Sequence, residues 1–287
     1  MEKRFLVVGI ALLAVLFSTH AQTTDFLELV KTATPQSVLD AINKGANMQA
    51  RDSMGRGPLL VAASNNPSPE VITILLKAGE DVNGLDREGN NCLVWAARNN
   101  FEVIAALLKA GADVETRDPL YDATALMWAA SDSADPNVIT ALLKYGADIK
   151  GRNRDNLTSL MWAAMKNKNR EVIVTLLNAG AELNARDCGD RTALMWAARS
   201  NPSAEVINTL LDAGANIESV DFMGRTPLMI AAETNSNPDV LIALLKAGAD
   251  AQAKDKEGKT ALDYAKGNYS LRVRGADALR LLQAASQ

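Results

Sequence analysis

The sequence predicts an all-α repeat solenoid, because two short phrases recur along the chain at a nearly constant spacing. The first phrase reads TALMWAA at residues 124–130 and again at 192–198, with TSLMWAA between them at 158–164. Related heptapeptides continue this register in both directions, at starts 33 or 34 residues apart. A catalytic motif is needed once per active site, whereas a stacked unit needs its packing residues in every copy.

The second phrase keeps the same spacing and marks the end of each unit. It reads LLKAG or a close variant, and its apolar residues are typical of one face of a helix. Its closing glycines are Gly79, Gly111, Gly146, Gly180, Gly214 and Gly248. Each unit therefore carries two anchors, one near its beginning and one near its end.

The stretch 187–220 gives a physical reason for both phrases. Thr192 is placed to cap a first helix, because its hydroxyl can accept a hydrogen bond from an amide of the first turn. A second amphipathic helix is expected from Val206, after a break rich in Asn, Pro and Ser. Gly214 is expected to end it in the left-handed conformation, before an extended finger that turns at Gly224.

This unit resembles the ankyrin repeat, whose signature joins a period of about 33 residues to a T-P-L-H-x-A phrase and two helices after a β-turn. The resemblance implies helix-turn-helix units with β-hairpin fingers, in six full repeats between degenerate terminal caps. The family's histidine in the first helix is replaced, mostly by methionine, so packing is expected to take over its role. The expected boundaries are 22–51 for the N-terminal cap, 52–85, 86–117, 118–152, 153–186, 187–220 and 221–254 for the repeats, and 255–287 for the C-terminal repeat or cap.

Residues 22–287 are expected to form one domain, because no linker rich in Gly, Pro or Ser interrupts the series. The terminal caps need a polar outer face, since no further repeat covers them. At the C-terminal end this face is expected from Arg272, Arg274 and Arg280.

A cleavable secretory signal peptide is expected at residues 1–21. Lys3 and Arg4 precede an apolar run over 5–17, and the small residue Ala21 follows it. A membrane anchor is the less favoured interpretation, because the run would span about 20 Å of a hydrocarbon core of about 30 Å. We therefore expect a periplasmic or secreted protein, cleaved near Ala21, with no membrane insertion of the mature chain.

Composition disfavours several classes of function. The chain has 287 residues, of which 48% are apolar and 22% charged, and a net charge of -4, so nucleic acid is not an expected partner. Cleavage would remove His20, the only histidine, and with it any imidazole for a Ser-His-Asp triad or a His-ligated zinc site. We predict no catalytic residue, no cofactor and no metal.

The two cysteines, Cys92 and Cys188, are not expected to form a disulfide. Three repeat intervals separate them, or about 24 to 30 Å of stacked helices, whereas a disulfide needs Cα atoms within about 7 Å. Cys92 is expected to be half-buried at the start of a first helix, and Cys188 to be exposed beside a finger turn.

Two repeated series admit both a structural and a functional interpretation. Tryptophan occupies one position in four consecutive units, and filling the seam between helix pairs is favoured over an aromatic binding track. An aspartate begins most fingers, and turn structure is favoured over acid–base chemistry, which needs two carboxylates in a shared cleft. The tryptophans are Trp95, Trp128, Trp162 and Trp196.

The side chains that packing leaves free are the finger tips and the solvent-facing ends of the first helices, which differ between units. We expect a monomeric, non-enzymatic module that binds a protein partner along this concave face, as the family resemblance also implies. A secreted effector that acts on a foreign or host protein is one alternative, and an enzyme that uses Asp, Glu or Lys groups in the groove is another. The expected partner contacts are Leu120, Tyr121, Met165, Arg199, Phe222 and Met223.

Overall fold

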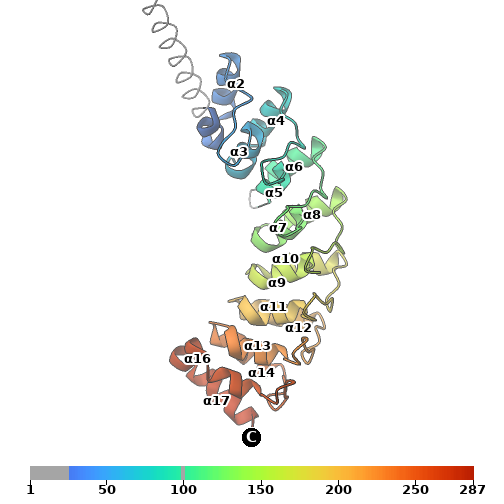
Figure 1. The fold of residues 1–287 in the computed structure, drawn as a ribbon, viewed down its shortest axis with the longest axis vertical. Coiled ribbons are helices and arrows are strands. Elements are labelled where there is room, and N and C mark those ends of the chain that lie inside the picture. The colour runs from blue at the N-terminus through green and yellow to red at the C-terminus, as the bar shows by residue number, and fades with distance from the viewer. Residues whose placement is uncertain (1–25, 98–100) are drawn as a thin grey trace, which may run out of the picture. The chain divides into compact units, whose positions relative to one another are not determined.

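The computed structural model describes residues 26–97 and 101–287, which form pairs of helices separated by extended loops (Figure 1). The chain divides into two compact units, residues 1–119 and 120–287, and each is described by itself. The expected signal peptide, residues 1–21, lies outside the described residues. The expectation of a single domain stays a prediction.

In the first unit, the second helix of each pair packs on the second helix of the next. Helix α2 contacts α4 and α4 contacts α6, while the first helices α3 and α5 contact each other. Residues 26–32 are also helical, so the N-terminal cap contributes a helix pair of its own. The bounds are α2 (Pro35–Asn43), α3 (Pro58–Asn65), α4 (Pro69–Lys77), α5 (Cys92–Ala96) and α6 (Phe101–Lys109).

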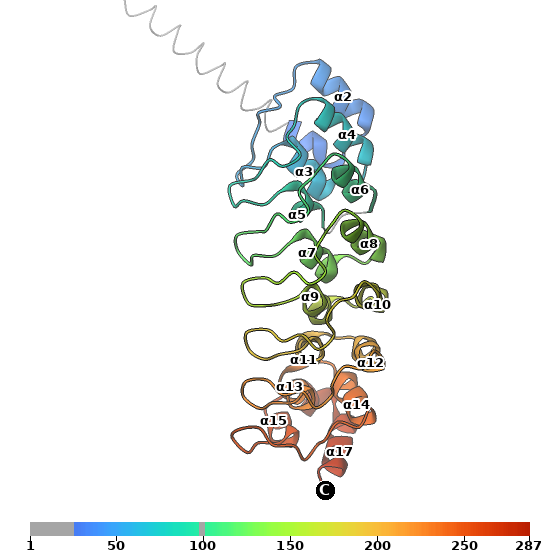
Figure 2. The same ribbon diagram turned by 90° about the vertical axis from the view of Figure 1, so that its right-hand side faces the viewer.

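The second unit continues the pattern as two parallel rows of helices (Figure 2). The first helices α7, α9, α11, α13 and α15 pack in that order, and so do α8, α10, α12, α14 and α17. The bounds are α7 (Ala125–Asp132), α8 (Pro136–Lys144), α9 (Ser159–Lys166), α10 (Arg170–Asn178), α11 (Ala193–Ser200), α12 (Ala204–Asp212), α13 (Pro227–Thr234), α14 (Pro238–Lys246), α15 (Ala261–Ala265), α16 (Tyr269–Arg274) and α17 (Ala276–Ala285). The two rows confirm the all-α repeat solenoid.

The helix ends follow from local chemistry, as the sequence predicts. The hydroxyl of Thr192 accepts a hydrogen bond from Met195 N–H at 3.4 Å and so caps α11. Gly214 ends α12 with φ 93, a value that an L-residue with a side chain rarely adopts. The N–H groups of Gly214 and Ala215 then donate to the last carbonyls of α12. Each repeat therefore turns at a fixed point.

Each finger is a hairpin turn held by a few main-chain hydrogen bonds. In the sixth repeat, Asp221 N–H donates to Arg225 O at 3.1 Å, and Gly224 N–H donates to Asp221 O at 2.9 Å. Gly224 is left-handed with φ 81, which is the pattern of a type I turn followed by a bulge residue. In the fourth repeat an isolated antiparallel bridge joins Arg152 to Thr158 across the finger. Three fingers place Asp122, Asn156 or Asp190 in the left-handed position, where glycine stands in the others.

The aspartate that begins a finger serves the turn. In the sixth repeat, Asp221 Oδ1 accepts from the N–H groups of Met223 and Arg225, both at 2.9 Å. Asp52 and Asp187 make equivalent bonds in their own fingers. The turn interpretation of these carboxylates is therefore confirmed.

A row of buried asparagines joins successive repeats where each first helix ends. The Nδ2 group of Asn201 donates to Ala164 O at 2.9 Å and to Asn167 O at 2.8 Å, both in the preceding repeat. Its Oδ1 accepts from Ser203 N–H, so every polar atom of this buried amide group is bonded. Asn167, Asn235 and Asn268 repeat the two inter-repeat bonds, and we call these four residues the asparagine ladder.

The core lies between the two rows of helices. The methionines at the family's histidine position, such as Met195, are buried, and so is the small pair Ala197 and Ala198 beside them. Packing therefore replaces the missing histidine, as expected. Small residues let the first helices approach closely, so this seam has no room for larger side chains.

The C-terminal cap is only partly polar on its outer surface. Its three arginines are exposed, as expected. Tyr269 and Val273, one helical turn apart on α16, are also 75% and 60% exposed. The cap therefore ends the stack with a mixed surface, which the charge pattern alone did not predict.

Candidate binding surface

The fingers project on the side of the first helices, as the second unit shows in Figure 2. Neighbouring fingers are joined at their tips, because Phe222 N–H donates to Gly189 O at 3.0 Å and Lys256 N–H donates to Met223 O at 3.0 Å. In the first unit, Arg87 N–H donates to Met54 O in the same way. Each unit therefore presents its tips as a connected series beside the first helices.

The six residues expected to contact a partner all lie in the second unit, on different fingers and helices. Leu120, Tyr121 and Phe222 are 72%, 46% and 51% exposed, which is unusual for large apolar side chains. Met165, Arg199 and Met223 are half-buried. Leu120 and Tyr121 belong to the finger before α7, whereas Phe222 and Met223 belong to the finger before α13.

The position held by the four tryptophans, which we call the aromatic slot, lies against the base of the finger. Trp95 Nε1 donates to Asp86 Oδ2 at 2.9 Å, and Trp196 Nε1 donates to Asp187 Oδ2 at 3.0 Å. Each indole is half-buried. Seam filling is therefore an incomplete description, because Trp95 and Trp196 are bonded to their fingers and part of each of the four rings reaches solvent.

Three aromatic rings form a cluster beside α7 and α9. Tyr121 lies edge-on to Trp128 and Trp162, with ring centroids 5.8 and 5.9 Å away, and the two indoles are 5.0 Å apart. Such edge-to-face pairs are worth about 0.5 to 1.5 kcal/mol beyond area burial. Tyr121 is thus both a finger-tip residue and a packing residue, which the sequence pattern did not reveal.

Asn153 bonds the main chain of one member of this cluster. Asn153 stands where other fingers have aspartate, and its Nδ2 donates to Tyr121 O at 3.1 Å. Its Oδ1 accepts from the N–H groups of Asp155 and Leu157. No acceptor is left for the slot tryptophan of this repeat, and Trp162 Nε1 has no hydrogen-bond partner among the described residues.

An ion-pair network strengthens the sixth repeat. The guanidinium of Arg225 donates to Asp221 Oδ2 through Nε and Nη2, at 3.0 and 2.8 Å, and to Glu233 Oε2 at 2.8 Å. Burial disfavours the charge of Arg225, but the bonds to Asp221 and the attraction of both carboxylates raise the pKa of its side chain. The side chains of Asp221 and Arg225 are 0% and 9% exposed, so water screens this pair little.

The two thiols differ sharply in access. Cys92 is completely buried rather than half-buried, because its Sγ lies in the interior and donates to Val82 O at 3.0 Å. Burial raises the pKa of the Cys92 thiol to about 12. Cys188 is exposed, and both cysteines are free thiols, as expected. Cys188 is therefore the thiol that solvent reaches.

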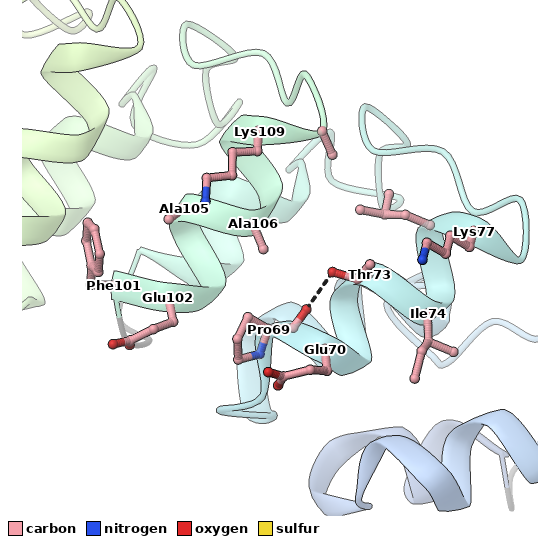
Figure 3. A pocket seen from close by; sticks show the side chains of 12 residues that line it. Pro69, Glu70, Thr73, Ile74, Lys77, Phe101, Glu102, Ala105, Ala106 and Lys109 are labelled. Atoms are coloured by element: carbon pink, nitrogen blue, oxygen red, sulfur yellow. Dashed lines mark hydrogen bonds between the residues drawn. The ribbon is translucent and has the colours of Figure 1, made fainter.

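A groove of about 870 Å³ lies on the opposite, second-helix surface of the first unit (Figure 3). It runs between α4 and α6, with Ile74 and Phe101 among its apolar lining. Lys77 and Lys109 line the end near the helix C-termini, and Glu70 and Glu102 the other. Nothing in the sequence pattern predicted a groove there, since it depends on two neighbouring small residues, Ala105 and Ala106.

Within the described part of the chain, no group of three or more His, Cys, Asp or Glu side chains is placed to hold a metal ion. The same residues include no helix long and apolar enough to cross a bilayer. The features that remain on this surface are the exposed apolar tips, the half-exposed rings of the aromatic slot, and charged side chains of which only some form ion pairs within the described ranges.

Comparison with known families agrees with this architecture. A family model described as ankyrin repeats, in three copies, matches residues 26–118, 126–221 and 194–282. These matches extend over nearly all of the described residues, through both compact units. A comparison with curated proteins finds no significant match.

Proposed function

Because the chain belongs to the ankyrin-repeat family, we propose that it binds another protein along the face formed by its fingers and first helices. Ankyrin repeats are in general protein–protein interaction modules, and such proteins are typically non-enzymatic scaffolds. We further propose that this chain acts outside the cytoplasm and has no catalytic activity of its own.

One observation carries the choice of surface. Leu120 and Phe222 are large apolar residues on finger tips, and more than half of each side chain is in contact with water. Neither is needed to fill the repeated core, because the corresponding positions in other fingers differ in size and polarity. Exposed apolar side chains of this kind are typical of protein-binding surfaces, where a partner removes them from water.

The half-exposed aromatic slot supports the same surface. Its rings lie between the finger bases and the first helices, and finger aspartates hold the N–H groups of Trp95 and Trp196. Tryptophan and tyrosine are enriched among the residues that dominate binding energy, because they combine large apolar area with few rotatable bonds. A partner that covers the tips would also cover these rings.

The test is to truncate two exposed tips together, in a variant with Leu120→Ala and Phe222→Ala. The protein would first be used to isolate its partner from an envelope extract, and the affinity for that partner would then be measured by calorimetry. We expect a loss of at least about 2 kcal/mol in binding free energy, because desolvated apolar anchors contribute this much. The melting temperature should be nearly unchanged, because both side chains are exposed.

Tyr121 is left out of this variant, because its ring packs on Trp128 and Trp162 and its loss would also change stability. Charge reversal at Lys144 and Lys246, which are exposed on the second helices, is the control. A third variant, Ala106→Arg, fills the groove between α4 and α6. If the control or the groove variant abolishes binding while the tip variant binds normally, the partner uses the second-helix face and the proposal is wrong.

Export is the second part of the proposal, and it rests on the charged, apolar and small residues that follow one another in 1–21. Intact-mass measurement on protein from an osmotic-shock fraction should give an N-terminus at or near Gln22. Full-length protein in the membrane pellet would contradict it.

A further inference from the structure

In the first, second, fifth and sixth repeats, two side-chain positions are placed to bond the same carboxylate oxygen of the finger aspartate. The finger aspartate offers Oδ2 both to the residue four positions later and to the aromatic slot nine positions later. In the sixth repeat the slot holds Ile230, which has no donor, and Arg225 binds Asp221 Oδ2. In the first repeat the slot holds valine, and Arg56 Nε binds Asp52 Oδ2 at 2.8 Å.

In the second repeat a slot tryptophan shares this oxygen with a neutral side chain. Trp95 Nε1 and Asn90 Nδ2, four positions after the aspartate, both donate to Asp86 Oδ2, at 2.9 and 3.1 Å. Because Asn90 is uncharged, this arrangement leaves no cation at that position without a partner. The outcome in each repeat therefore follows from which two residue types stand at these positions.

The fifth repeat is the one that combines an arginine at the first position with a tryptophan in the slot. Trp196 Nε1 occupies Asp187 Oδ2 at 3.0 Å, and Arg191 makes no ion pair within the described residues. Arg191 Nε is buried without a hydrogen-bond partner, while the guanidinium carbon lies 5.0 Å from the centroid of the Trp196 ring. A buried donor that has no acceptor costs free energy. A ligand that supplies an acceptor to this guanidinium group would therefore be favoured.

A second arginine lies against the same ring. Arg199, three residues after Trp196 on α11, places its guanidinium carbon 5.9 Å from the ring centroid. Two carboxylates on this surface are already engaged: Asp187 binds backbone N–H groups and the indole, and Glu233 binds Arg225. Two guanidinium groups therefore flank one indole without a paired carboxylate, on a chain whose net charge is negative.

We propose that Arg191, Arg199 and Trp196 form a docking position for a carboxylate side chain of the partner protein. Arginine suits this role, because its planar guanidinium donates two parallel hydrogen bonds to a carboxylate. Phe222, exposed on the next finger, bonds through its N–H to Gly189 of this finger. The occupant is therefore an acidic segment in which a glutamate or aspartate stands close to an apolar residue.

This inference rests on the proposed binding face and names the chemistry that part of the face recognises. The site is a single repeat with two arginine charges that are unpaired within the described residues, and not a continuous basic stripe. Because a nucleic acid needs many basic contacts along its phosphates, a protein carboxylate fits this site better. The stacking on Trp196 holds the guanidinium groups in place and leaves their outward N–H groups for the ligand.

The test uses a defined peptide in place of the unknown partner. The capped peptide acetyl-Gly-Glu-Phe-Glu-Gly-amide is titrated into the protein, and the indole Nε1–H signals are followed by NMR, with that of Trp196 assigned through Trp196→Phe. We expect the Trp196 signal and the Arg191 Nε–H signal to shift and saturate at millimolar peptide. The matched peptide with Gln for Glu should leave both signals in place.

Variants identify the residues involved. Arg191→Gln and Arg199→Gln should each weaken the acidic peptide about tenfold, as expected for the loss of a charge-assisted hydrogen bond. Lys246→Gln, which removes an exposed charge from α14, should bind the peptide unchanged. Thermal unfolding checks that the arginine variants remain folded, which is expected since neither arginine forms an ion pair with a residue of the described ranges.

Three outcomes would overturn the inference. One is an equal response to the Glu and Gln peptides, and another is normal binding of the acidic peptide by the variant that lacks both arginines. The third is a response to inorganic phosphate without any response to the acidic peptide, which would assign the site to a free anion. The peptide experiment is independent of partner capture, so a failure of the proposed binding face in the tip variants would be recognised separately.

Discussion

Replacing Asn201 by alanine should lower the free energy of unfolding by about 3 to 5 kcal/mol. The substitution leaves Ala164 O and Asn167 O without their buried donors, and Ser203 N–H without its acceptor. Each buried polar group left unpaired costs about 1 to 3 kcal/mol. Because two of these bonds cross to the preceding repeat, the loss weakens an interface and not only one turn. Urea unfolding followed by circular dichroism measures the change.

Asn208 provides the matched control for this experiment. It is exposed on α12, seven residues from Asn201, and Asn208→Ala removes the same atoms from the surface. Its cost should stay below about 0.5 kcal/mol, because surface substitutions of this kind seldom exceed that. Equal losses at the two positions would mean that the asparagine ladder contributes nothing beyond helix propensity.

Asp221→Asn should also be strongly destabilising, by about 3 to 5 kcal/mol. The amide can still accept the finger N–H bonds through Oδ1, but its NH2 group replaces the oxygen that binds Arg225. The guanidinium of Arg225 would then be buried with one carboxylate, Glu233, in place of two. Removing one partner of a buried ion pair costs this much, because a charge is left uncompensated.

A double-mutant cycle with Arg225→Leu tests the reason. The fourth repeat already has Asn153 at the start of its finger and Leu157 four residues later, and its turn forms with the same hydrogen bonds. The double variant should therefore be clearly more stable than the sum of the two single losses predicts. Strictly additive losses would show that the charge of Arg225 is not what makes Asp221→Asn costly.

The structure of one repeat could be predicted from the sequence, because it is built from local signals. Thr192 caps a helix through an amide three residues away, and Gly214 ends one through its own backbone conformation. The finger aspartates bond N–H groups two and four residues further along. Each of these interactions joins residues within one turn, so that the residue type and its immediate neighbours are enough to predict it.

The candidate surface could be predicted only in outline. The exposed tips at Leu120 and Phe222 follow from their place in the repeat, because residues outside the repeated core have nothing to pack against. Tyr121 was placed on the same surface, yet it also packs on two indoles that come 7 and 41 positions later in the chain. Burial of Cys92 and the groove at Ala105 likewise depend on neighbouring repeats, which a single repeat does not reveal.

The sequence by itself determined the period, the helix pairs and the turns, and the tertiary structure decided how equivalent positions are used. The asparagine ladder was visible as an Asn that recurs every 34 residues at three positions, but its bonds reach across to the preceding repeat. Arg191 Nε has no hydrogen-bond partner among the described residues in the repeat where Trp196 bonds the carboxylate of Asp187. Stacking brings residues 34 apart into contact, and competition for a shared acceptor is settled by distances that local sequence rules do not contain.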